Sequence, residues 1–208
     1  LILHPNGNLV VAVCQDTSST YLTPAFLATK SDFIKTFDLV VIDTNIPAES
    51  IQWVIDFTNA HQQKLLIEPV SVAKATKLAS LNLAGVFMIT PNEDELAASA
   101  GLETTDESAL LDHLFHRGVQ QVWVRKGNQG SVICTPHHKL ALGVPHITIT
   151  DSTGAGDAAL AGWVFGYVNQ EKEQTCLELA HALALTVLQT KGAVVPNLNS
   201  KTLYKIKK

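Results

Sequence analysis

Apolar residues fall into short runs along this chain, and these runs alternate with stretches whose apolar residues recur at helical spacing. The short runs predict strands at 37–43, 64–69, 85–91, 120–127, 131–135 and 146–150. The helical spacing predicts helices at 47–63, 72–81, 93–101, 106–118, 155–168 and about 174–190. Because strands and helices alternate and the strands are continuously apolar, we predict an α/β fold. We expect three layers, with a mainly parallel sheet and helices on both faces.

The first residues carry a different pattern. Ile2-Leu3 and Leu9–Val13 flank Asn6-Gly7, a residue pair that is favoured in the tight turns of β-hairpins. The sequence has no initial Met, no basic segment and no cleavage signal before this hairpin. Since proteins seldom begin inside a strand pair, we expect the sequence to be a fragment of a longer protein.

Composition narrows the class of protein. Hydrophobic residues make up 46% of the 208 residues and charged residues 16%, which indicates a well-buried globular chain. The net charge of −4 argues against nucleic acid or an anionic membrane as a partner. No apolar run reaches the ~18 residues that span a bilayer. The three cysteines, Cys14, Cys134 and Cys176, are scattered, which favours the reducing cytoplasm over a disulfide framework.

The segment "DSTGAGD" carries the most specific candidate chemistry. It places Gly154, Ala155 and Gly156 between a predicted strand and a predicted helix, directly before Asp157. Ligands of parallel α/β sheets lie beyond the carboxyl ends of the strands, and free N–H groups at a helix start stabilise an anion such as phosphate. Asp157 fits there as a base that accepts the proton of a hydroxyl attacking phosphorus. The alternative is an ordinary helix start with a favourable first-turn aspartate.

Two further segments follow predicted strands. In "TPNEDE", Asn92 and Glu95 could hold phosphate oxygens and the water around Mg²⁺, and the alternative is a capping box that only starts a helix. In "VRKGNQGS", Gly127 and Gly130 form a turn that could face a nucleotide, and the alternative is a plain hairpin loop. The chain contains no "GK" dipeptide and no early G-x-G-x-x-G. These absences exclude a P-loop and give an NAD-linked oxidoreductase poor support.

Together, "TPNEDE", "VRKGNQGS", "DSTGAGD" and "TKGAVVP" occur in the order and spacing of the ribokinase-like (PfkB) carbohydrate kinases, and the chain resembles this family over nearly its whole length. The resemblance implies the ribokinase-like fold and transfer of phosphate from ATP, with Mg²⁺, to a hydroxymethyl group of a sugar or nucleoside. It implies that Asp157 is the catalytic base and that 154–156 form the anion hole. Asn92 and Glu95 match the pair that organises magnesium and the phosphates.

The resemblance also implies roles around the nucleotide. Arg125, Lys126, Gly127 and Gly130 match a strand and turn that line it, and His181 matches a position beside the adenine, although a packed or solvent-facing histidine is an equal alternative. In many members a loop cradles a monovalent cation such as K⁺. The residues that match this loop are Asp151, Thr153 and Gly192, with backbone near Val187 and Thr190.

Within the family, residues 43–59 and the segment "EPVSVAKATKL" look most similar to pseudouridine kinases. Their corresponding segment reads Asp-Pro-Val-Ser, whereas this chain carries Glu68 in place of the aspartate. Ribokinases, fructokinase-like enzymes and other nucleoside kinases stay open as alternatives.

The family's N-terminal part, with its sugar-binding Gly-Gly-x-x-x-Asn segment and most of a β-lid, is not found in the sequence. We therefore interpret residues 1–14 as a remnant of the lid hairpin and 15–208 as the C-terminal, nucleotide-binding part of the α/β domain. Two hypotheses follow: a kinase of a small nucleoside or sugar, or a non-catalytic nucleotide-binding relic of the fold. Lid hairpins of this family often form homodimers, so a dimer is a further expectation.

Overall fold

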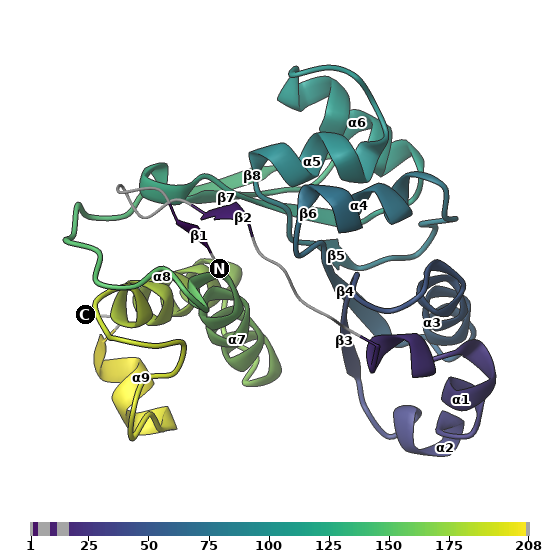
Figure 1. Ribbon diagram of the computed structural model, residues 1–208, viewed down its shortest axis with the longest axis horizontal. Coiled ribbons are helices and arrows are strands. Elements are labelled where there is room, and N and C mark those ends of the chain that lie inside the picture. The colour runs from purple at the N-terminus through teal and green to yellow at the C-terminus, as the bar shows by residue number, and fades with distance from the viewer. Residues whose placement is uncertain (1, 4–8, 12–16, 207–208) are drawn as a thin grey trace. The chain divides into compact units, whose positions relative to one another are not determined.

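The computed structural model describes residues 2–3, 9–11 and 17–206 (Figure 1). In chain order the elements are β1 (Ile2–Leu3), β2 (Leu9–Val11), the 3-10 helix η1 (Ser19–Tyr21), α1 (Pro24–Ala28), α2 (Ser31–Ile34), β3 (Leu39–Asp43), α3 (Ala48–Ala60), β4 (Lys64–Glu68), α4 (Val72–Ala79), β5 (Met88–Ile89), α5 (Glu93–Ala100), α6 (Glu107–His116), β6 (Gln121–Arg125), the 3-10 helix η2 (Gly127–Gln129), β7 (Ser131–Cys134), β8 (Lys139–Leu142), α7 (Ala155–Val168), α8 (Glu173–Leu188) and α9 (Ser200–Ile206).

The main sheet confirms the predicted α/β fold class. Its six strands lie in the order β3-β4-β5-β6-β7-β8. The neighbours from β3 to β6 pair in parallel, while β6 and β7 pair antiparallel, so the sheet is mixed. The parallel strands bring Glu68, the residues after Ile89, and Arg125 to the same carboxyl edge, because parallel neighbours end on the same side of a sheet.

The described chain forms two compact units. One comprises β1, β2, 128–130 and 142–206, and the other comprises 17–127 and 131–141. In the second unit the three central residues of β4, Leu65, Leu66 and Ile67, are apolar and almost completely buried, as a parallel strand covered on both faces requires. Helix α3 adds Ile51 and Ile55 to the core that contains Leu65 and Ile67, and burial of each such side chain contributes about 1.5–3 kcal/mol.

The first unit rests on close packing of α7 against α8. Gly162 of α7 lies so near α8 that a Cβ atom there would come within 2.6 Å of the Leu179 carbonyl oxygen. The face of α8 expected from helical spacing is buried at Leu179, Leu183 and Val187. Leu203 of α9 packs on this cluster. Small residues on α7 therefore let the two helix backbones approach each other.

The structure corrects the predicted strand at 146–150. Its residues form no strand, and Ile149 is exposed. The N–H groups of Thr150 and Asp151 instead donate to one carbonyl oxygen, that of Leu188 at the end of α8, at 2.8 and 3.3 Å. Alternation of Ile and Thr has the period of a strand, but these residues find no partner strand within the described chain.

Short elements were missed by the sequence pattern. Strand β8 and the helices α1, α2 and α9 were not predicted. Helix α1 has only five residues, and local chemistry starts it: the Thr23 hydroxyl accepts the N–H of Phe26, and Pro24 follows at the first helical position. Such elements contain too few residues for a period to emerge.

The predicted N-terminal strand pair is present as β1 and β2, which pair antiparallel through Ile2 with Val11 and Leu3 with Leu9. Its predicted turn, Asn6-Gly7, lies outside the described residues. Cys134 and Cys176 are buried and form no disulfide, while Cys14 also lies outside the described residues. Within the described chain, no helix is both long and apolar enough to cross a membrane.

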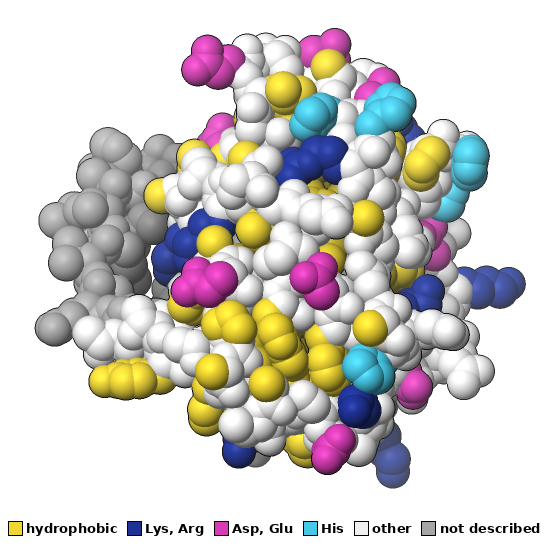
Figure 2. All heavy atoms as spheres, turned by 90° about the vertical axis from the view of Figure 1, so that its right-hand side faces the viewer, with side chains coloured by type: hydrophobic (Ala, Val, Ile, Leu, Met, Phe, Trp, Pro, Cys, Tyr) yellow, Lys and Arg dark blue, Asp and Glu magenta, His cyan; other side chains and the backbone are white. Residues whose placement is uncertain are grey.

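Among the described residues, strand β3 is one of the two edge strands of the main sheet, and β8 is the other. Val41 of β3 is 42% exposed, and Phe33 and Phe37 before it are also exposed. Hydrophobic side chains gather on the lower part of the molecular face in Figure 2. The exposure of Val41 distinguishes β3 from β4 and β6, whose central residues are buried.

Candidate active site

The "DSTGAGD" segment forms a fixed loop that ends in an uncapped helix. Gly154 adopts the left-handed conformation (φ 79°), and a Cβ atom there would lie 2.9 Å from both Cβ and the carbonyl oxygen of Ala193. Helix α7 begins at Ala155 without a side-chain cap. Among the described residues, no acceptor receives the N–H groups of Gly156 or Asp157. Two free donors at the positive end of a helix dipole suit an anion.

Asp157 lies at the third position of α7 and is exposed. No described residue donates a hydrogen bond to its carboxylate. The side chain is therefore available to a ligand, and in the first turn of the helix it stands beside the free N–H groups. This geometry fits both the predicted base and the ordinary first-turn aspartate.

Asp151 fixes the start of this loop. Its Oδ1 accepts the N–H of Thr153 at 2.9 Å, and its Oδ2 accepts the N–H of Gly192 at 3.0 Å. These bonds, first those from Thr153 and then that from Gly192, lower the pKa of the Asp151 carboxyl. The structure thus brings together the three residues that the resemblance assigns to a cation loop. A cation role for them stays a prediction.

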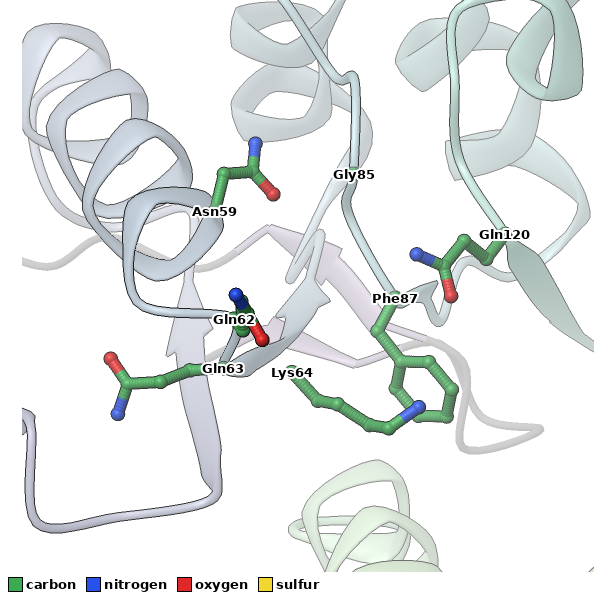
Figure 3. A pocket seen from close by; sticks show the side chains of 7 residues that line it. All are labelled: Asn59, Gln62, Gln63, Lys64, Gly85, Phe87 and Gln120. Atoms are coloured by element: carbon green, nitrogen blue, oxygen red, sulfur yellow. The ribbon is translucent and has the colours of Figure 1, made fainter.

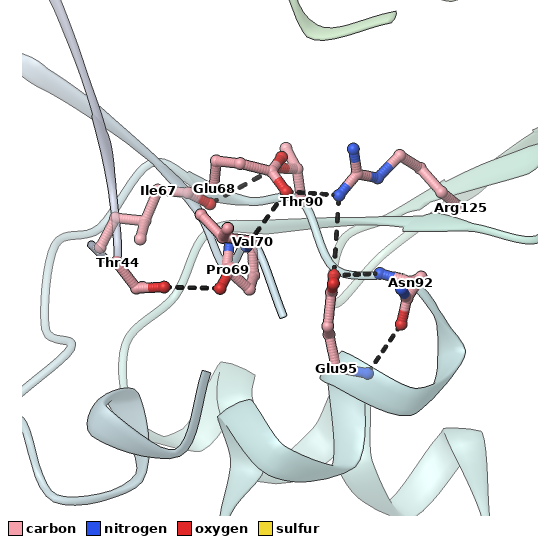
Figure 4. A network of polar contacts seen from close by, with 9 residues as sticks. All are labelled: Thr44, Ile67, Glu68, Pro69, Val70, Thr90, Asn92, Glu95 and Arg125. Carbon is pink, nitrogen blue, oxygen red and sulfur yellow. Dashed lines mark hydrogen bonds and ion pairs between the residues drawn. The ribbon is translucent and has the colours of Figure 1, made fainter. Parts of the chain in front are cut away.

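A second group of polar residues lies at the carboxyl edge of the main sheet (Figure 4). Glu68 ends β4, Thr90 follows β5, Arg125 ends β6, and Asn92 and Glu95 start α5. Nη2 of Arg125 lies 2.6 Å from Oε1 of Glu68 and 3.7 Å from Oε2 of Glu95. Both carboxylates are buried, with residue exposures of 8% and 4%.

Asn92 and Glu95 form the capping box that was the alternative interpretation. The Asn92 side chain accepts the N–H of Glu95 at 2.8 Å, and Oε2 of Glu95 accepts the N–H of Asn92 at 2.9 Å. Burial raises the pKa of the Glu95 carboxyl, while the Asn92 N–H and the Arg125 charge oppose that rise. Its Oε1 receives no hydrogen bond from any described residue. The capping box therefore leaves one carboxylate oxygen for a ligand.

The turn after β6 has the geometry of a hairpin loop. Gly127–Gln129 forms the 3-10 helix η2, and β6 and β7 on either side pair antiparallel. Gly130 must be a glycine, since a Cβ atom there would meet the Leu142 carbonyl oxygen at 2.0 Å. Lys126 pairs with Glu107, a contact that raises the pKa of the lysine. The hairpin is thus present, and a nucleotide role for this turn stays a prediction.

His181 lies on α8 and is 9% exposed, so the packed-histidine alternative describes its environment. Burial lowers the pKa of its imidazole, and a hydrogen bond with the backbone of Gly143 opposes that shift. A contact with adenine stays a prediction.

Residues 2–200 match the pfkB family carbohydrate kinases. This match covers nearly the whole chain and includes every candidate site residue. The chain belongs to the pfkB family. Its membership confirms the resemblance seen in the four sequence motifs.

Three known members illustrate the similarity. The pseudouridine kinase of Escherichia coli is 28% identical over 173 residues, which cover 79% of this chain and 54% of that enzyme. The structure of a carbohydrate kinase from Agrobacterium tumefaciens has a TM-score of 0.78 and 24% identity over 99% of this chain and 66% of that one. Ribokinase of Arabidopsis thaliana, solved with ribose and ATP, has a TM-score of 0.75 and 24% identity over 86% and 59%. The chain spans about half the length of the curated relatives it matches.

The residues present fit the ATP and magnesium that are bound by pfkB kinases. The uncapped start of α7 offers N–H donors to a phosphate, and Glu95 offers a hard carboxylate oxygen. Within the described chain, no group of three or more His, Cys, Asp or Glu side chains could hold a metal ion by itself. Mg²⁺ does not need such a group, because it is commonly bound through one or two carboxylates, waters and substrate phosphates.

Sequence reasoning missed two members of the carboxyl-edge group of this pfkB chain. Thr90 donates its hydroxyl to Oε2 of Glu68 at 2.6 Å, and Glu68 binds Arg125, which lies 57 positions away. Glu68 had been noted only as a departure from the aspartate of pseudouridine kinases. A charged residue that ends a continuously apolar strand was the signal available for it.

A hollow of about 210 Å³ lies near the opposite, amino ends of β4 and β6 and beside the segment before β5 (Figure 3). Most of its lining side chains end in carboxamides. The residues that line it are Asn59, Gln62, Gln63, Lys64, Gly85, Phe87 and Gln120. None of the predicted site residues lines it. Since ligands of parallel sheets bind at the carboxyl edge, this hollow is not the candidate active site.

Proposed function

We propose that the protein is an ATP-dependent phosphotransferase that acts on a hydroxymethyl group of a nucleoside or sugar. The observation that carries the proposal is the start of α7, where the pfkB motif "DSTGAGD" presents two free N–H groups beside an exposed, unpaired carboxylate. Free donors and a carboxylate base are the two functions that phosphoryl transfer to a hydroxyl requires of a protein.

In the proposed reaction Asp157 accepts the proton of the substrate hydroxyl as its oxygen forms a bond to the γ-phosphorus of ATP. The bond from that phosphorus to the ADP oxygen breaks, and the N–H groups at the start of α7 stabilise the negative charge. Gly154 keeps the loop close to Ala193, and Asp151 holds the loop in place. Magnesium, when bound, neutralises charge on the phosphates.

The remaining site residues are proposed as ligand contacts. Asn92 and Glu95 would hold magnesium and phosphate oxygens, and the segment 125–130 with His181 would line the nucleotide. Asp151, Thr153 and Gly192 would form a K⁺ loop. A cytoplasmic location and a homodimer stay predictions.

Pseudouridine is the first substrate to test. Support comes from the 28% identity to the E. coli pseudouridine kinase and from the similarity of residues 43–59. Ribose, fructose and other nucleosides are the alternative substrates, and ribose has support from the fold that the chain shares with the ribokinase of A. thaliana. A non-catalytic nucleotide-binding protein is the second candidate function, since the exposed Asp157 also fits an ordinary first-turn aspartate at a helix start that binds phosphate.

The test measures ADP release with pseudouridine, uridine, ribose and fructose, together with direct binding of Mg–ATP. It uses the 208-residue chain and any longer form that its gene encodes. Turnover of one substrate by either form supports the kinase and names the substrate. Binding of Mg–ATP without turnover in any form supports the non-catalytic alternative, and no binding at all overturns both.

A further inference from the structure

Arg125 is shared unequally between two buried carboxylates at the carboxyl edge of the main sheet (Figure 4). Its Nη2 donates to Oε1 of Glu68 at 2.6 Å, whereas Oε2 of Glu95 is 3.7 Å away, beyond hydrogen-bond distance. Glu95 instead uses that oxygen to accept the N–H of Asn92. The Arg125 guanidinium is therefore hydrogen-bonded to Glu68 and not to Glu95.

Glu68 is anchored by hydrogen bonds to groups other than Arg125. Its Oε2 accepts the hydroxyl of Thr90 at 2.6 Å, and its Oε1 also accepts the N–H of Val70 at 3.3 Å. Thr90 is completely buried, and Glu68 ends a strand whose three preceding residues are buried. A carboxylate anchored through both oxygens at a strand end has little freedom to follow a moving partner.

The charges of this group do not balance. Two buried carboxylates face one guanidinium, so the three side chains together carry one excess negative charge. If Glu68 lost its charge, Glu95 would be the only carboxylate left to Arg125. The attraction between opposite charges in a buried site would then draw the guanidinium onto Glu95.

We propose that Glu68 is a positioning residue that holds Arg125 away from Glu95 and so leaves the Glu95 carboxylate available to magnesium. This inference rests on the proposed function, because it concerns the same site. It assigns Glu68 no contact with the ligands. It also gives Arg125 a defined position, in which its guanidinium is hydrogen-bonded to Glu68 and does not occupy the Glu95 carboxylate.

The test measures binding of Mg–ATP and of ATP in EDTA to the 208-residue chain by titration calorimetry. Glu68→Gln should weaken Mg–ATP binding about tenfold, as loss of a supporting residue around a metal commonly does. The affinity for ATP in EDTA should stay within about twofold, the usual error of additivity. Glu68→Asp keeps the charge and should retain most of the Mg–ATP affinity. Thermal unfolding shows that each variant is folded.

A double variant separates positioning from a structural role. Glu68→Gln combined with Arg125→Met removes the cation that would otherwise close onto Glu95. Because Arg125 is itself proposed to line the nucleotide, Arg125→Met alone is the reference, and the double variant should bind Mg–ATP within about threefold of it. If Glu68→Gln weakens Mg–ATP binding as much in the Arg125→Met background as in the wild type, or if Glu68→Gln binds as well as the wild type, the inference is wrong. If the wild type itself binds no Mg–ATP, the proposed function fails and the inference falls with it.

Discussion

The carboxylate of Asp151 joins two loops of the same unit that lie 41 positions apart. Its Oδ2 accepts the N–H of Gly192 at 3.0 Å while its Oδ1 closes a turn on the N–H of Thr153. Gly192 has a φ of 91°, a conformation that favours glycine. The loop before α7 and the loop after α8 are therefore held together by one side chain.

This relationship predicts a loss of stability in acid. The pKa of the folded Asp151 lies below the value of about 3.9 for an unfolded aspartate, so the unfolded chain binds the proton more tightly. The stabilisation is present above that unfolded value and is lost as the pH falls through the lower, folded pKa. Urea titrations at a series of acidic pH values should show this loss in the wild type and a flatter profile in Asp151→Asn. Equal slopes in both proteins would contradict the account.

The burial of His181 predicts a second pH dependence of stability, near neutral pH. Its folded pKa is lowered by burial, so the unfolded chain takes up the proton first as the pH falls. Stability should therefore decrease as the pH is lowered from about 7.5 through the ordinary histidine pKa of about 6.5. His181→Gln should remove part of this slope in urea titrations. The exposed His146→Gln is the matched control, and a slope that changes equally in both variants would contradict the prediction.

Because α7 packs closely on α8, one added methyl group at Gly162 should destabilise the protein. Gly162→Ala would place a Cβ atom 2.6 Å from the Leu179 carbonyl oxygen, so the helices must separate. Overpacking of this kind commonly costs about 1–3 kcal/mol. Gly143→Ala is the control, because nothing lies within 4 Å of its added Cβ atom. Thermal unfolding should show a lower midpoint for Gly162→Ala alone.

Substitution of Gly154 should lower both the stability of the protein and its affinity for the phosphates of ATP. Gly154→Ala combines an unfavourable left-handed conformation with contacts of 2.9 Å to Ala193, and such strain costs on the order of 1–3 kcal/mol. Gly127→Ala is the control for stability, because it is also left-handed at φ 54° but its Cβ atom meets nothing. Thermal unfolding should rank Gly154→Ala below Gly127→Ala. Unchanged Mg–ATP affinity in a folded Gly154→Ala would argue against an anion at the start of α7.

The sequence predicted those features that depend on neighbouring residues. The spacing of Asn92 and Glu95 indicated the capping box, and helical periodicity placed α7 at its observed bounds. The contacts of Glu68 with Arg125 and of Asp151 with Gly192 join residues 57 and 41 positions apart. The spacing of residues within one helix or strand cannot reveal such pairs, because only the fold brings them together. The strand predicted at 146–150 was wrong for a related reason: Ile147 and Ile149 alternate, but no partner strand is present to pair with them within the described chain.

The most direct measurement of the proposed chemistry compares Asp157→Asn with the wild type in the form of the protein that releases ADP. We predict that turnover falls at least about 100-fold, the smallest usual contribution of a general base, while Mg–ATP affinity stays within a few-fold. Asp112→Asn, which removes an exposed carboxylate of α6, should leave both quantities unchanged. Turnover of Asp157→Asn at the wild-type rate would contradict the central claim that Asp157 takes the proton of the substrate hydroxyl.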